Sequence, residues 1–288
     1  MKVNVLKTNM LYQEMLALPD SERGAFFDEK LLQPFTPLYE LTGMSRNPQA
    51  VSCLALTGTD AQAQEMLDRL TAADAWKKAH QTVESAVKNL QMAEISMPDT
   101  LTLGIFLGDP AMLALSEGYT GVGSIPGFIQ IMIAPDEQNL SRLASCIAHD
   151  FHHNVLFHNV TWSFMNVSLS QYLAVEGLAE SFAAALYGDD LIGPWVTGVK
   201  DADLARTQTI IGENLDVEGF MEVRQYMFGS HPMVPGSETT GLPYCSGYAA
   251  GYHAIKAYLN KTGRTIADAT KDFISGNDII RLSGYFPD

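Results

Sequence analysis

The sequence predicts an α+β fold in which helices predominate. Only two short β-rich runs occur, both near the middle of the chain, and apolar residues at helical spacing fill most of the remainder. Hydrophobic residues make up 47% of the 288 residues and charged residues 18%, so the chain has enough apolar material for a sizeable core. We therefore expect a globular protein.

The first part of the chain is predicted to be helical. Residues 9–31 carry short helical patterns, and residues 60–90 combine helical spacing with strong helix formers and contain neither Gly nor Pro. One break in the second segment is expected near Thr71. We predict a helical N-terminal region over residues 1–98 and a second domain over residues 99–288, with one continuous domain as the alternative.

The two β-rich runs are predicted strands at residues 101–107 and 128–133, because both are bounded by Gly, Pro and Asp. Between them lies GYTGVGSIPG, which has four glycines and no basic residue. It lacks the lysine and the spacing of a phosphate-binding loop, so it is interpreted as a tight connection.

The rest of the chain is predicted to be almost wholly helical. The expected helices span residues 139–158, 169–187, 201–213, 216–227, 246–261 and 265–282. The stretch from Gly229 to Tyr244 contains three prolines and three glycines. A loop of that length is more often functional than idle, and we expect it to line a cleft.

Composition excludes several classes of protein. Lys and Arg number 18 against 33 Asp and Glu, which gives a formal net charge of −15, so a nucleic-acid binder with a basic face is not expected. No run approaches the roughly 18 apolar residues of a membrane span. Three dispersed cysteines without a CxxC pair are typical of a reducing compartment. We expect a cytoplasmic protein.

Four of the seven histidines fall within the run HDFHHNVLFH. His149 and His153 are four residues apart, so on a helix both imidazoles face one way and could bind one zinc ion. Asp150 would then take a proton from the water at the metal. The alternative is a polar helix face with accidental spacing.

A second acidic pair follows in AVEGLAESF. Glu176 and Glu180 are also one turn apart, in an otherwise apolar helix, where two buried charges need a cation or hydrogen-bond donors. This pattern favours Glu176 as the third zinc ligand and Glu180 as the acceptor for the ring N–H of a ligand histidine. The alternative is a solvated pair of carboxylates.

Three motifs together resemble a known family. AHDFHHNV, AVEGLAESFAAALYG and LPYCSGYAAGYHAIKAYL, in this order, are similar to motifs of the bacterial predicted zinc-dependent proteases known as DUF2268 or YjaZ-like. The first two also resemble the paired motifs of gluzincin metallopeptidases. The resemblance implies a zincin-type fold: a small sheet on an active-site helix, followed by a helical lobe. It also implies that strand 128–133 is the edge strand that pairs with an extended peptide.

One residue departs from the family pattern. Asp150 stands where the family has Glu, and its side chain reaches roughly 1.5 Å less far, whereas a general base must lie within about 2.6 to 3.2 Å of its proton. In zincins a Tyr or His of the C-terminal lobe donates to the oxyanion, so Tyr248 or Tyr252 is expected to do so here. The alternative for these tyrosines is packing in the core.

The sequence thus predicts a zinc metallopeptidase that hydrolyses peptide or protein substrates by metal-activated water. His149, His153 and Glu176 would bind Zn²⁺, Asp150 would be the base, and Glu180 would orient the site. The alternative is a catalytically weak or inactive zincin-like metal-binding protein that binds a peptide or protein partner. A helical structural protein without metal is the third reading.

Overall fold

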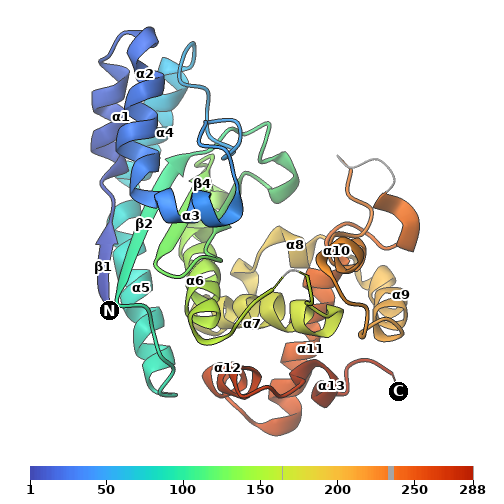
Figure 1. The fold of residues 1–288 in the computed structure, drawn as a ribbon. Helices are drawn as coiled ribbons and strands as arrows, with labels where there is room; N and C mark the ends of the chain where they lie inside the picture. The colour runs from blue at the N-terminus through green and yellow to red at the C-terminus, as the bar shows by residue number, and fades with distance from the viewer. Residues whose placement is uncertain (164, 233–236, 288) are drawn as a thin grey trace. The chain divides into compact units, whose positions relative to one another are not determined.

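A sheet of four strands, with helices between its first two strands and after its last, organises the first part of the chain (Figure 1). The computed structural model describes residues 1–163, 165–232 and 237–287. The described residues are mostly helical with a small mixed sheet, which confirms the predicted α+β class.

The chain folds into two units, one comprising residues 1–87 and 97–154 and the other residues 88–96 and 155–288. The first unit contains β1 (Lys2–Val5), α1 (Thr8–Leu16), α2 (Asp20–Phe26), the π-helical segment η1 (Phe27–Leu32), η2 (Gln33–Phe35), α3 (Thr36–Thr42), α4 (Asp60–Ala72), β2 (Thr100–Leu107), η3 (Ala114–Ser116), β3 (Tyr119–Val122) and β4 (Phe128–Ile133). Two helices, α5 (Ala75–Gln91) and α6 (Glu137–Asn159), begin in this unit and end in the second.

The second unit is helical. It contains α7 (Leu169–Tyr187), η4 (Asp189–Leu191), α8 (Pro194–Thr197), α9 (Asp201–Gly212), α10 (Phe220–Phe228), η5 (Ser237–Thr240), α11 (Ser246–Thr262), α12 (Ile266–Ile274) and α13 (Ile279–Ser283). The helix predicted over 265–282 is two helices, and Gly276 at φ +87° lies at the break between them. The predicted loop from Gly229 to Tyr244 includes η5, and its residues 233–236 lie outside the described part of the chain.

Strand order in the sheet is β1-β2-β4-β3, with β3 antiparallel to β4 and the other pairs parallel. The prediction that residues 128–133 form the edge strand is wrong, because β4 pairs with β2 on one side and with β3 on the other. The strand at that edge is β3, which lies within the glycine-rich stretch interpreted as a tight connection.

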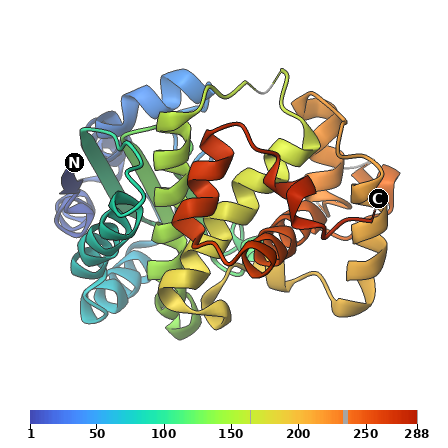
Figure 2. The same ribbon diagram turned by 90° about the horizontal axis from the view of Figure 1, so that it is seen from below.

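The two faces of the sheet are covered by different parts of the first unit. A Cβ added to Gly104 of β2 would lie 2.9 Å from the Phe35 ring, whereas one added to Gly121 of β3 would meet Asp150 of α6. Figure 2 shows α6 running beside the strands. The active-site helix predicted from sequence therefore packs directly on the sheet.

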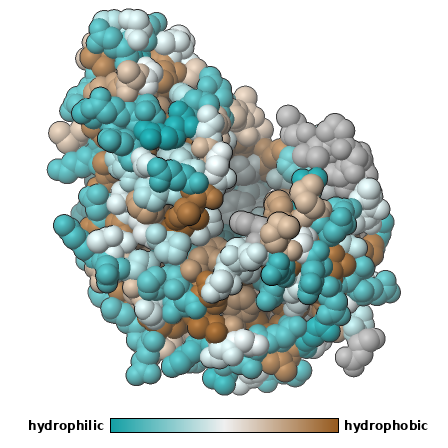
Figure 3. All heavy atoms as spheres, viewed as in Figure 1, coloured by the Kyte–Doolittle hydropathy of each residue, from teal (hydrophilic) through white to brown (hydrophobic). Residues whose placement is uncertain are grey.

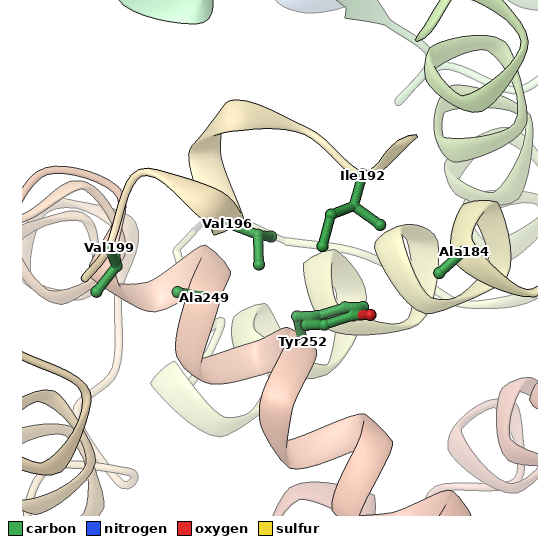
Figure 4. Packing of buried hydrophobic residues seen from close by; sticks show 6 residues of the cluster. All are labelled: Ala184, Ile192, Val196, Val199, Ala249 and Tyr252. Atoms are coloured by element: carbon green, nitrogen blue, oxygen red, sulfur yellow. The ribbon is translucent and has the colours of Figure 1, made fainter. Parts of the chain in front are cut away.

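Helices α7 and α11 form the centre of the second unit, and α10 and α13 contact both. Gly177 of α7 faces Gly251 of α11 so closely that a Cβ on either glycine would meet backbone atoms of the other helix. Beside this contact, a cluster of buried apolar residues joins α7, α8 and α11 (Figure 4): Ala184, Ile192, Val196, Val199, Ala249 and Tyr252. Small residues thus let the two central helices pack backbone to backbone.

Hydrophilic side chains cover much of the face shown in Figure 3, with hydrophobic side chains scattered among them. Among the described residues, no helix combines the length and the apolar character needed to cross a bilayer.

Candidate metal centre

The two histidines of the HDFHH motif lie side by side on α6. Their Nε2 atoms are 3.0 Å apart, and the rings meet edge to face at 83°. Each side chain is buried, with 7% of its residue surface exposed. Two donors of one tetrahedral zinc ion, each about 2.0 to 2.1 Å from the metal, are separated by roughly 3.4 Å. The two imidazoles are therefore already spaced close to the separation that a shared ion requires.

Glu176 completes a group of three metal-binding side chains. One carboxylate oxygen of Glu176 and one ring nitrogen each of His149 and His153 all lie within 4.8 Å of one another. All three residues are buried, Glu176 with 9% of its surface exposed. Two imidazoles and one carboxylate are a donor set typical of catalytic zinc, with a fourth position left for water. The cluster is thus compatible with a metal site.

Local sequence fixes the helix that carries Glu176. Ser168 caps α7 by accepting a hydrogen bond from the amide of Gln171, and the Gln171 side chain accepts one from the amide of Ser168. This capping box sets the first turn. From Leu173 to Ala184 every residue of α7 is buried, so the carboxylate of Glu176 is held inside the second unit.

Asp150, the predicted base, is 4% exposed and its carboxylate points toward strand β3. The Sγ atom of Cys146, one turn earlier on α6, lies 3.8 Å from Asp150 Oδ2. A Cβ at Gly121 would overlap the same carboxylate. The side chain therefore lies between its own helix and the edge strand.

The two candidate tyrosines have different surroundings. Tyr252 donates a hydrogen bond of 2.8 Å to Asp189, and its ring belongs to the apolar cluster of Figure 4. Tyr248 packs its ring against Phe228. Burial raises the pKa of Tyr248 well above its usual value, and the nearby charge of Glu176 raises it further. Of the two hydroxyls, that of Tyr248 thus lies in the electrostatic environment of a candidate metal ligand.

Glu180 makes contacts that the sequence analysis did not predict. Its Oε1 accepts a hydrogen bond of 2.5 Å from the amide of Gly193, and its Oε2 accepts one of 2.7 Å from Nε1 of Trp195. The carboxylate, 2% exposed, thereby holds the segment that leads into α8. Orientation of a ligand histidine by Glu180 stays a prediction.

Sequence reasoning also missed Asn154. Its side chain accepts a hydrogen bond from the Gly127 amide and donates to the carbonyls of Gly123, Ile125 and Phe128. These bonds fasten α6 to the connection between β3 and β4. The sequence contains a signal that could have identified it. Cys146, Asp150 and Asn154 follow each other at four-residue spacing and form one stripe on the helix.

Comparison with known proteins identifies the family of the chain. The family described as "Predicted Zn-dependent protease (DUF2268)" matches residues 75–281. The chain belongs to this family. The "Uncharacterized protein YjfC" of Bacillus subtilis (strain 168) is 34% identical to it in an alignment 302 positions long that covers 97% of each chain. No solved structure matches the DUF2268 chain significantly. The resemblance stated from the three motifs is therefore confirmed at the level of the family.

Proposed function

We propose that this protein is a zinc-dependent peptidase of the zincin type. The observation that carries the proposal is the approach of His149, His153 and Glu176 to within 4.8 Å of one another, all buried. Family membership supports it, since the family is described as predicted zinc-dependent proteases. The order of sheet, histidine-bearing helix and glutamate-bearing helix along the chain also supports a zincin-like fold.

The residues of this chain have separate roles in the proposed reaction. When bound, zinc would polarise the scissile carbonyl and make a water molecule more acidic. Asp150 accepts the proton of the attacking water and passes it to the leaving amine. Tyr248 donates a hydrogen bond to the oxyanion. A phenol is protonated at neutral pH, as this donation requires.

Strand β3 supplies the proposed binding site for an extended peptide. Among the described residues it has a strand neighbour on one side only, and an edge strand is where an extended peptide can be added to a sheet. The same strand carries Gly121, against which the Asp150 carboxylate lies. A peptide paired with β3 would therefore pass beside the base. We expect a peptide or protein substrate rather than a nucleic acid.

A cytoplasmic location is the final part of the proposal. It is supported by Cys53, Cys146 and Cys245, which are all buried and form no disulfide.

The test is hydrolysis of a mixed library of unstructured peptides by the purified protein. We expect turnover that a chelator abolishes and that stoichiometric zinc restores. Turnover that persists in the presence of the chelator would contradict a metal-dependent mechanism. A zinc-loaded protein that cleaves nothing would instead favour the metal-binding protein without hydrolytic activity.

A further inference from the structure

The carboxylate of Asp150 occupies the space that a side chain at position 121 would need. A Cβ placed on Gly121 would lie 2.5 Å from Cγ and 3.0 Å from Oδ1 of Asp150, and closer still to Oδ2. Real Cβ atoms do not approach other heavy atoms so closely. The absence of a side chain at Gly121 is therefore what allows the carboxylate to lie there.

The register of the sheet explains why these two residues meet. Gly121 is paired with Ile131 of β4, and side chains at paired positions point to the same face, here the face that α6 covers. Two residues later, a Cβ on Gly123 would lie 2.7 Å from Cβ and 2.8 Å from the carbonyl carbon of Asp150. Glycines thus let the edge strand run almost in contact with the helix.

Neighbouring residues of α6 hold this arrangement from both sides. Cys146 presents its thiol 3.8 Å from Oδ2, within reach of a weak S–H donor. Asn154 ties the helix to the backbone that follows β3 through four hydrogen bonds. Strand β3, the thiol of Cys146 and the amide of Asn154 therefore define a slot that fits one short acidic side chain.

We propose that Gly121 is a positioning residue for Asp150. Because Gly121 has no side chain, the short carboxylate of Asp150 fits in a slot against the edge strand. The helix and the strand lie so close together that Asp at this position can do what Glu does in related motifs. This inference rests on the proposed function for its catalytic meaning. The slot itself is a property of the folded chain without metal, and it can be tested separately.

The first experiment is a double-mutant cycle on metal-free protein, read by thermal unfolding in the presence of a chelator. Gly121→Ala should lower Tm by roughly 5 °C, because the new methyl group must displace a buried carboxylate. In the Asp150→Ala background, which lacks the overlapping atoms, at least half of that loss should disappear. Equal losses in both backgrounds, or no loss in either, would overturn the proposal.

Gly123→Ala, just after the end of β3, is the matched control. Its Cβ would meet the backbone and Cβ of Asp150, atoms that Asp150→Ala retains, so its loss of Tm should be the same in both backgrounds. Gly24→Ala controls for the general effect of the substitution, since nothing lies within 4 Å of a Cβ there. Should Gly121→Ala fail to fold alone, folding of the double variant supports the slot and failure of both contradicts it.

The second experiment measures the catalytic consequence in the zinc-loaded protein. Gly121→Ala should lower kcat about 100-fold with KM and zinc content within twofold of the unmodified protein, since only the base is displaced. Unchanged kcat would refute the positioning role even if the cycle shows coupling. If the unmodified protein has no turnover, the proposed function fails, while the cycle still decides whether the slot exists.

Discussion

The indole nitrogen of Trp195 donates a 2.7 Å hydrogen bond to the buried carboxylate of Glu180. The second oxygen of Glu180 accepts from the amide of Gly193. Gly193 directly precedes α8 and Trp195 lies in its first turn, so this carboxylate connects α7 to the next helix. A buried carboxylate that accepts two N–H groups contributes to stability as well as to any site nearby.

Glu180→Gln should therefore destabilise the protein by about 1 to 3 kcal/mol, because an amide offers only one oxygen to two N–H donors. The expected result is a lower Tm and tryptophan emission shifted to longer wavelength as Trp195 loosens. Glu213→Gln, at an exposed position, is the control and should change neither. An unaltered Tm in Glu180→Gln would show that the two bonds add little.

Zinc content tests the three proposed ligands. The unmodified protein should carry about one zinc per chain, and Ala at His149, His153 or Glu176 should each remove most of it, because two ligands hold the ion far less tightly than three. Elemental analysis after dialysis gives the stoichiometry. His80→Ala, at an exposed histidine of α5, should retain full occupancy. Full occupancy in Glu176→Ala would assign the third position to another group.

Replacements at Asp150 test the base. Asp150→Asn keeps the size of the side chain but removes its basicity, so we expect a loss of 10² to 10⁴ in kcat with zinc retained. Asp150→Glu should also lose activity, because the shorter carboxylate already lies against Gly121 and we expect another methylene to displace it from that position. Peptide hydrolysis and zinc content are measured on the same preparations. A gain of activity in the Glu variant would mean that the site is a decayed zincin.

The roles of Tyr248 and Tyr252 can be distinguished by removing the hydroxyl group from each. Tyr248→Phe should lower kcat about 100-fold and leave zinc content and Tm nearly unchanged. Tyr252→Phe should instead lower Tm, because it removes the hydrogen bond to Asp189, with specific activity per folded molecule unchanged. The opposite assignment of these effects would make Tyr252 the oxyanion donor.

Acid stability should depend on Asp60. Its hydrogen bond from Arg23, together with the charge of that guanidinium, lowers the pKa of the carboxyl below its usual value. A carboxyl whose pKa is lowered by folding stabilises the protein at pH values above the pKa that it has in the unfolded chain, about 3.9. This contribution disappears as the pH falls through the pKa of the folded state. The difference in Tm between native protein and Asp60→Asn should therefore be present at pH 7 and shrink below about pH 4. Asp68→Asn, on the same helix, is the matched control, and an equal pH trend in both variants would contradict this assignment to Asp60.

Helices were largely predictable because their signals are local. The predicted segment 169–187 has the limits of α7, where the structure shows a capping box of Ser168 and Gln171 at the start and Gly188 after the last turn. The break between α4 and α5, expected near Thr71, lies between Ala72 and Ala75. Two strands were missed. β1 pairs with β2 about a hundred residues away, and β3 has a glycine-rich sequence that is typical of turns.

The candidate site, too, could be predicted only where the signal is local in sequence. His149 and His153 could be paired from sequence because four-residue spacing on a helix fixes their relation. The contact between Asp150 and Gly121 depends on how closely β3 approaches α6, which no local pattern encodes. Likewise, the spacing of Glu176 and Glu180 predicted that both side chains point the same way. It did not predict that the indole of Trp195 donates a hydrogen bond to Glu180.

The hydrogen bonds of Asn154 have a consequence for how this region can vary. All four partners are main-chain atoms of Gly123, Ile125, Gly127 and Phe128, so the amide recognises the course of the backbone rather than the side chains it carries. Ser124, whose side chain takes no part in these bonds, should therefore tolerate diverse replacements. A change in the length of the connection would shift those carbonyls away from the amide. In the connection between β3 and β4, side-chain substitutions should thus be tolerated, whereas insertions should destabilise the protein.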